Sequence, residues 1–187
     1  MRLFIAIEVD EGVRERLVEA QRQLAKAPCK VKWVEPQNLH LTLKFLGEVP
    51  DHQVRAIADA MTRAARDAKP FEMKVAGLGT FPPKGVPRVV WAGVEAMQVR
   101  PLHRRLEAAL EALGHEPEKR AFHPHLTLGR VKGREGTREL RSLLESLAAT
   151  EFGTAPVAQV VLMQSTLSPA GPTYTPIHHA PLGRGER

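Results

Sequence analysis

The chain contains the same tetrapeptide twice, as His40-Leu41-Thr42-Leu43 and as His125-Leu126-Thr127-Leu128. Successive side chains of a β-strand point to opposite faces, so each copy would present a histidine and a threonine on one face and two leucines on the other. The two polar residues would lie about 7 Å apart along the strand, which is two steps of roughly 3.3 Å. Two such faces turned toward each other would offer two imidazoles and two hydroxyls to one small anion.

The repetition extends over most of the chain at a constant offset of 85 positions, the separation of His40 and His125. Helical periodicity follows the first apolar run of each half and also follows each tetrapeptide. We therefore predict a single domain made by internal duplication, approximately residues 1–85 and 86–170, in which each half runs β-α-β-α-β. A pseudo-two-fold axis between the halves would turn the tetrapeptide strands toward each other. The offset relates four strand-like runs in two pairs, residues 4–9 with 89–94 and 71–79 with 156–164.

Short local signals predict where the helices and turns lie. Asp10 and Asp51 are placed to cap the two helices of the first half. A loop rich in proline and glycine at residues 81–87 separates the halves, and a last short strand is predicted from Thr173 to His179. The positions expected to face inward on the four helices are Val13, Leu17, Ala20 and Leu24; Val54, Ile57, Met61 and Ala65; Val99, Leu102, Leu106, Leu110 and Leu113; and Leu140, Leu143, Leu144 and Leu147.

Length and composition limit the class of protein. A chain of 187 residues can bury a substantial core, and 43% hydrophobic with 26% charged residues is typical of a soluble globular protein. The net charge of +6 favours an anionic partner, of which nucleic acid fits better than a membrane surface. Cys29 is the only cysteine, which excludes an intramolecular disulfide. No apolar run approaches the ~18 residues of a membrane span, and the apolar start is too short for a signal peptide. We expect a cytoplasmic protein.

A metal site is the main alternative use of the histidines. His123-Pro124-His125 is a His-x-His pair, and His178-His179 lies near the end of the chain. Hydrolytic metal sites usually add carboxylates or a third imidazole, but neither tetrapeptide contains an acidic residue. We therefore expect no metal and no cofactor. The chain also lacks the Gly-x-Ser-x-Gly turn of serine hydrolases and the Gly-x-x-x-x-Gly-Lys loop of nucleotide sites.

Basic residues flank both tetrapeptides and could bind phosphate. Strict alternation places Lys44 on the face of His40 and Thr42, and it places Phe45 with the leucines in the core. Alternation places Arg130 on the leucine face, so that a phosphate-binding role for Arg130 requires a bulge or a strand end. Lys132 is expected to be a solvated side chain. Candidates for stacking on a nucleobase are Trp33, Phe81, Trp91, Phe122 and Tyr174, although large aromatics are more often core residues.

The paired His-x-Thr-x motifs resemble those of the two-histidine (2H) phosphoesterase superfamily. Within it, the chain is similar to the bacterial and archaeal RNA 2′,3′-cyclic phosphodiesterases, also called 2′-5′ RNA ligases. Four flanking segments carry the same resemblance: residues 2–6, 43–47, 87–91 and 164–174. The resemblance implies an α+β, bilobal fold in which two antiparallel sheets, flanked by helices, surround a central cleft.

The resemblance also implies an activity. Family members hydrolyse RNA 2′,3′-cyclic phosphate ends to 2′-phosphomonoesters without metal, and they can join RNA ends by the reverse chemistry through a 2′-5′ linkage. By resemblance, His40 is the proton donor, His125 is the proton acceptor, and Thr42, Thr127 and Arg130 bind the phosphate. The expected partner is RNA with cyclic phosphate ends, for example tRNA halves, and the expected state is a monomer.

Two alternative functions stay open from the sequence. One is a 2H esterase acting on another small cyclic or 2′-5′ phosphodiester. The other is a non-catalytic module that binds RNA ends. The presence of histidine and threonine in both copies favours an enzyme, because binding alone does not need two titratable groups.

Overall fold

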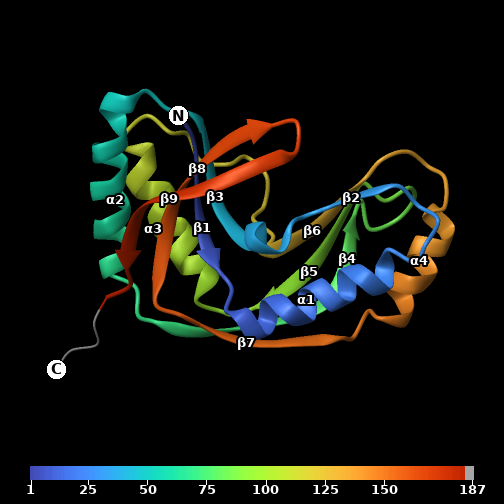
Figure 1. Ribbon diagram of the computed structural model, residues 1–187. Helices are drawn as coiled ribbons and strands as arrows, with labels where there is room; N and C mark the ends of the chain where they lie inside the picture. Colours follow the sequence, from blue (N-terminus) through green and yellow to red (C-terminus); the bar gives the residue numbers. More distant parts are fainter. Residues whose placement is uncertain (184–187) are drawn as a thin grey trace.

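The structure is a computed structural model in which residues 1–183 are described (Figure 1). These residues form an α+β fold in which nine antiparallel strands make one curled sheet and four α-helices pack on it. The strands are β1 (Arg2–Glu8), β2 (Val31–Trp33), β3 (His40–Glu48), β4 (Phe71–Phe81), β5 (Val89–Glu95), β6 (His125–Val131), β7 (Glu151–Val157), β8 (Gln159–Ser168) and β9 (Gly171–Pro181). The helices are α1 (Glu11–Leu24), α2 (Val54–Arg66), α3 (Val99–Glu111) and α4 (Thr137–Ser146), and short 3₁₀ turns span Pro36–Asn38 and Asp51–Gln53.

The strand order is β7-β4-β5-β6-β3-β1-β8-β9, with β2 paired to β6. This order is symmetrical about the boundary between β6 and β3, the two strands that carry the tetrapeptides. The two parts of the chain also exchange one strand each, because β4 lies beside β5 and β8 lies beside β1. The exchange is reciprocal, as a pseudo-two-fold axis between the two parts requires.

The prediction of two separate sheets is wrong. The two groups of strands are continuous, since β3 and β6 pair at one position, Leu41 opposite Leu126. Both leucines are fully buried, so they belong to the core that lies on the helix side of the sheet. The two predicted sheets are thus joined at this pair. Both tetrapeptides bury their leucines on the same side, so the two groups of strands share one core.

The helices cover the sheet in two pairs (Figure 1). Helices α2 and α3 pack on each other behind β3 and β9, and α1 packs with α4 near β7. Asp10 caps α1 as predicted, because its carboxylate accepts a hydrogen bond from the Val13 backbone N–H at 3.0 Å. Asp51 does not cap α2; it begins the 3₁₀ turn that precedes the helix, and no side chain caps the helix start at Val54.

The predicted strand positions are confirmed with shifted ends, except for the run at 156–164, and two strands, β2 and β7, were not predicted. The run predicted at 71–79 is β4, and the last strand, predicted from Thr173 to His179, extends over Gly171–Pro181. The run predicted at 156–164 contains the end of β7 and the start of β8, which are separated at Ala158.

A β-bulge interrupts the first tetrapeptide strand just after Thr42. Ala6 pairs with Thr42 and Ile5 pairs with Lys44, so Leu43 is an extra residue in β3. The bulge reverses the alternation predicted beyond it. Lys44 is therefore buried on the core side, and Phe45, which was predicted to be in the core, is 63% exposed.

The second tetrapeptide strand has a bulge at the corresponding position. Trp91 pairs with Thr127 and Val90 pairs with Gly129, so Leu128 is the extra residue in β6. Arg130 is thereby turned away from the leucine face and is exposed. This is the bulge that a phosphate-binding role for Arg130 required.

A buried glutamine of α1 stabilises the second bulge. The Gln21 side-chain amide donates hydrogen bonds to the carbonyl oxygens of Leu128 and Val34, both at 2.9 Å. Gln21 is 7% exposed, so these carbonyl groups have little access to water as an alternative partner. The contact links a helix directly to the strand that carries His125.

Replacing Gln21 by leucine is therefore expected to lower the free energy of unfolding by about 1–3 kcal/mol, the cost of leaving a buried polar group without its partner. Urea denaturation measures the change. Gln23→Leu in the same helix is the matched control, because the Gln23 amide donates only to the exposed Glu19 carboxylate. Equal stability of the Gln21 and Gln23 variants would contradict a supporting role for Gln21.

Candidate active site

The two tetrapeptides meet at the junction of β3 and β6. Because Leu41 lies opposite Leu126 in an antiparallel pair, the residues one step away in opposite directions also lie opposite each other. Each histidine is thus beside the threonine of the other strand. All four polar side chains are partly buried and lie on the face opposite the leucines. The structure therefore brings both predicted histidines and both predicted threonines to one place, which we call the polar face.

His40 is held by two short hydrogen bonds. Its Nδ1 lies 2.6 Å from the Asn38 carbonyl oxygen, and its Nε2 lies 2.7 Å from the Thr42 hydroxyl oxygen. A proton on Nδ1 can be donated to the carbonyl, which directs Nε2 to the polar face. Burial lowers the pKa of His40 below its ordinary value, and the bond to the Asn38 carbonyl opposes part of that shift.

His125 is oriented in the same way. Its Nδ1 lies 2.5 Å from the His123 carbonyl oxygen, again two residues earlier in the chain. Burial is the main cause that lowers the pKa of His125; the hydrogen bond to the His123 carbonyl raises it, and electrostatic interactions with the His123 ring and the Arg130 guanidinium lower it further. In both imidazoles Nδ1 is anchored to a backbone carbonyl oxygen, and in His40 Nε2 lies beside the Thr42 hydroxyl on the polar face.

Arg130 lies within electrostatic reach of both sides of the junction. Its charge lowers the pKa of His125 on β6, and it also opposes the burial that raises the pKa of Tyr174 on β9. An exposed guanidinium in this position can neutralise a phosphate held between the histidines. The arrangement of imidazoles, hydroxyls and one guanidinium suits acid–base chemistry on a phosphate ester.

Lys44 has a different role from the one predicted. Its Nζ lies 3.1 Å from a Glu107 carboxylate oxygen on α3 and 2.6 Å from the Glu116 carbonyl oxygen, which it reaches because of the bulge. Glu107 also accepts a hydrogen bond from the Glu118 backbone N–H at 3.1 Å. This buried ion pair fixes residues 116–118, in the segment that leads to His125. Lys44 cannot reach a phosphate on the polar face from there.

Aromatic side chains surround both histidines. The rings of Phe4 and Tyr174 lie 5.0 and 5.3 Å from the ring of His40, and the ring of Phe81 lies 5.0 Å from that of His125. Two of the predicted stacking candidates have internal partners instead. Phe122 stacks on His103 at 3.9 Å, and Trp33 packs against the core beside Gly129.

Phe45 is the exposed aromatic that sequence reasoning missed. Its ring lies 6.1 Å from that of Phe4, on the polar face, and no sequence signal marked the bulge that exposes it. Its counterpart at the offset of 85 is Arg130. The same position beside each histidine therefore holds a ring on one side and a cation on the other.

Two kinds of feature are absent from residues 1–183. In that part of the chain, no group of three or more His, Cys, Asp or Glu side chains is arranged to hold a metal ion. Over the same residues, no helix has the length and apolar character needed to cross a membrane.

The family model described as LigT like Phosphoesterase matches the chain in two stretches, residues 7–91 and 94–174. The chain belongs to this family. One tetrapeptide lies in each matched stretch, which agrees with the predicted internal duplication. The resemblance to 2H phosphoesterases, inferred from the motifs, is confirmed.

Relatives of this LigT-like chain cover almost its whole length. The RNA 2′,3′-cyclic phosphodiesterase of Methanothermobacter thermautotrophicus is 42% identical over 176 residues, which are 94% of this chain and 95% of that protein. The structure of TT0787 of Thermus thermophilus is similar with a TM-score of 0.85 and 36% identity, covering 99% of this chain and 100% of that one. The structure of E. coli LigT complexed with 3′-AMP has a TM-score of 0.77 and 26% identity, with 98% of each chain covered.

Removing the Lys44 ammonium while Glu107 stays is expected to destabilise this LigT-like fold by about 3–5 kcal/mol, because the buried carboxylate then loses the positive charge of Lys44. The double variant Lys44→Met/Glu107→Met should recover much of that loss, and urea denaturation measures both. Lys74→Met is the control, since Lys74 pairs with Glu151 at an exposed site. A Lys44→Met variant that is no less stable than Lys74→Met would contradict the buried pair.

Proposed function

We propose that this protein hydrolyses the 2′,3′-cyclic phosphate at the end of an RNA to a 2′-phosphomonoester. The observation that carries the proposal is the pairing of Leu41 with Leu126, which sets two identically anchored histidines and two threonines around one point on the polar face. The names of the relatives support the substrate, and the 3′-AMP complex of E. coli LigT supports a nucleotide ligand in this fold.

The proposed reaction is an in-line displacement at phosphorus. Neutral His125 accepts a proton from water at Nε2 as the water oxygen attacks the phosphorus. The bond from phosphorus to O3′ breaks, and protonated His40 donates its Nε2 proton to O3′. The phosphate stays on O2′. The water oxygen enters and O3′ departs on opposite sides of the phosphorus, so that a histidine on each of two neighbouring strands can assist one of them.

The hydroxyls and the guanidinium stabilise the phosphate during displacement. Thr42 can accept a hydrogen bond from protonated His40 and donate its own proton to a nonbridging oxygen, because its Oγ1 is 2.7 Å from the imidazole. Thr127 has the matching place on the other strand, and Arg130 opposes the charge of the nonbridging oxygens. With an RNA 5′-hydroxyl in place of the attacking water, the same displacement of O3′ would form a 2′-5′ linkage.

Asymmetry around the histidines determines which ribose oxygen leaves. Phe45 is exposed beside the His40 side and can stack on a nucleobase, whereas Arg130 occupies the corresponding place beside His125. A base on Phe45 brings the ribose to the His40 side and the phosphate charge to Arg130. This placement agrees with His40 as the donor to O3′.

The pH dependence of single variants assigns the two roles. His125→Ala should keep a residual activity that needs protonated His40, so this activity is present at low pH and is lost as pH rises through the lowered pKa of His40. His40→Ala should show the opposite slope, rising through the lowered pKa of His125 to a plateau. Initial rates on a 2′,3′-cyclic nucleotide measure both, and exchanged slopes would reverse the assignment.

The wild-type profile of kcat/KM should be bell-shaped. Because burial lowers both imidazole pKa values, its maximum should lie below about pH 6.5, the ordinary pKa of histidine.

His40→Ala and His125→Ala should each lose roughly 10²–10⁴-fold in kcat/KM at the pH of that maximum. The double variant should lose less than the product of the two, because the histidines act as a unit. A flat wild-type profile between pH 5 and 9 contradicts the mechanism.

The product of a cyclic-ended RNA should carry a 2′-phosphate and a free 3′-hydroxyl, and turnover should continue in excess chelator. Phosphorus NMR of the product distinguishes 2′- from 3′-phosphate. A product that is mainly 3′-phosphate would show that the donor and acceptor roles, or the orientation of the ribose, are reversed.

Substrate preference distinguishes the alternative functions. Turnover of another small cyclic or 2′-5′ phosphodiester in preference to RNA would favour the alternative esterase, and binding of RNA without turnover would favour a module that captures RNA ends.

A further inference from the structure

Seven positive charges and no acidic residues lie in three segments of sequence, residues 28–34, 82–90 and 128–134. The segments are neighbours in space, because β2 pairs with β6 and β6 pairs with β5. All seven side chains are exposed, and within residues 1–183 none of them forms a salt bridge. They are Lys30, Lys32, Lys84, Arg88, Arg130, Lys132 and Arg134.

Four of these cations share the polar face with the histidines, and we call Lys30, Lys32, Arg130 and Lys132 the basic strip. Val31 and Trp33, the residues that alternate with the two lysines of β2, pack on the core side; a Cβ on Gly129 would touch both. Lys30 and Lys32 must therefore point to the opposite, polar side.

The strip is continuous with the candidate active site. Lys32 is in register with Arg130, and the Lys132 backbone N–H donates to the Lys30 carbonyl at 2.7 Å, which extends the ladder by one more pair. Arg130, beside His125, begins the strip, and the lysine pair ends it at the edge of the sheet about 7 Å further along the strand.

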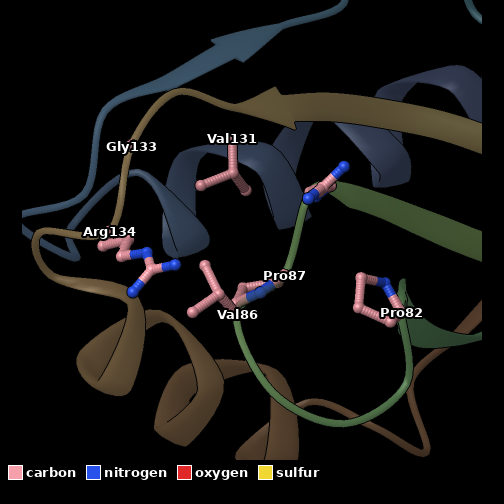
Figure 2. Close-up of a pocket in the computed structure, with 7 residues that line it drawn as sticks. Pro82, Val86, Pro87, Val131, Gly133 and Arg134 are labelled. Atoms are coloured by element: carbon pink, nitrogen blue, oxygen red, sulfur yellow. The ribbon is translucent and has the colours of Figure 1, made fainter.

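An open pocket of about 750 Å³ lies where the sheet ends, between the loop after β4 and the loop after β6. Arg88 and Arg134 contribute to its lining. Figure 2 shows Arg134 reaching from one loop toward Val86 in the other. Positive charge therefore continues past the strip.

Among residues 1–183, no such strip lies on the other side of the junction. The residues 85 positions before Arg130, Lys132 and Arg134 are Phe45, Gly47 and Val49. The hairpin formed by residues 164–176 of β8 and β9 contains no charged residue. Arg2 in β1 is in register with the acidic Glu48.

We infer that the basic strip binds backbone phosphates of the RNA on the 5′ side of the cyclic end, so that the body of the RNA leaves the polar face over β2 and the end of β6. The inference rests on the proposed function and extends it from the terminal nucleotide to the chain behind it. A single nucleotide has its phosphate between the histidines and leaves the lysines of the strip unused. Only a longer polyanion can match them.

The test compares two substrates and two triple variants. The substrates are adenosine 2′,3′-cyclic phosphate and a ten-nucleotide RNA that ends in the same cyclic nucleotide. The test variant is Lys30→Gln/Lys32→Gln/Lys132→Gln, which omits Arg130. The control variant, Arg55→Gln/Arg63→Gln/Arg66→Gln, removes the same charge from exposed positions of α2 at the other end of the molecule.

The test variant should lose on the order of tenfold in kcat/KM on the RNA and less than about twofold on the cyclic mononucleotide, and the control variant should lose neither. For the RNA, the slope of log affinity against log salt should become shallower by about 0.7 for each phosphate that the protein no longer neutralises. Equal losses on both substrates, no loss on RNA, or the same RNA loss in the control variant would each overturn the inference.

A binding measurement separates this inference from the proposed function. If the wild-type protein turned over neither substrate, the proposed function would fail. Fluorescence anisotropy of the labelled RNA with the wild-type protein and both variants would still test the strip. Weaker RNA binding by the test variant alone supports the strip, and equal binding by all three proteins refutes it.

Discussion

The single pairing of Leu41 with Leu126 is the contact on which the rest of the structure depends. It joins two groups of strands into one sheet, and it buries the leucines of both tetrapeptides in one core. Because side chains alternate along a strand, the same contact sets both histidines and both threonines on the opposite face. The placement of these four side chains on one face is therefore a consequence of core packing.

Much of this could be predicted from the sequence because repetition and alternation are visible in it. The offset of 85 predicted the four helices, both tetrapeptide strands and most of the other strands, but not β2, β7 or the break between β7 and β8 at Ala158. The polar face of each tetrapeptide followed from a period of two. The bulges at Leu43 and Leu128 could not be seen, since a bulge is an interruption of that period with no residue type of its own. For this reason Lys44 and Phe45 were each predicted on the wrong face, and the role of Arg130 depended on a bulge that only the structure shows.

The continuity of the sheet was also hidden in the sequence. Two similar halves predict two similar layers, but the sequence does not say whether their edges pair. The strand exchange, in which β4 lies beside β5 and β8 lies beside β1, could not be predicted for the same reason. The two halves of the sheet are nearly symmetrical, but residues at corresponding positions beside the two histidines differ. Phe45 and Arg130 occupy corresponding positions, and within residues 1–183 a basic strip lies on one side of the junction only. Those differences are what can distinguish the two oxygens of a cyclic phosphate.

The most direct test of the central claim is whether one phosphate contacts both histidines. Imidazole resonances of His40 and His125 can be followed by ¹⁵N NMR while adenosine 2′-monophosphate is titrated into the wild-type protein. We expect both resonances to shift along one saturation curve, and both imidazole pKa values to rise in the complex because an anion has bound beside them. A shift of one imidazole alone, or two curves with different midpoints, would contradict a shared site at the junction of β3 and β6.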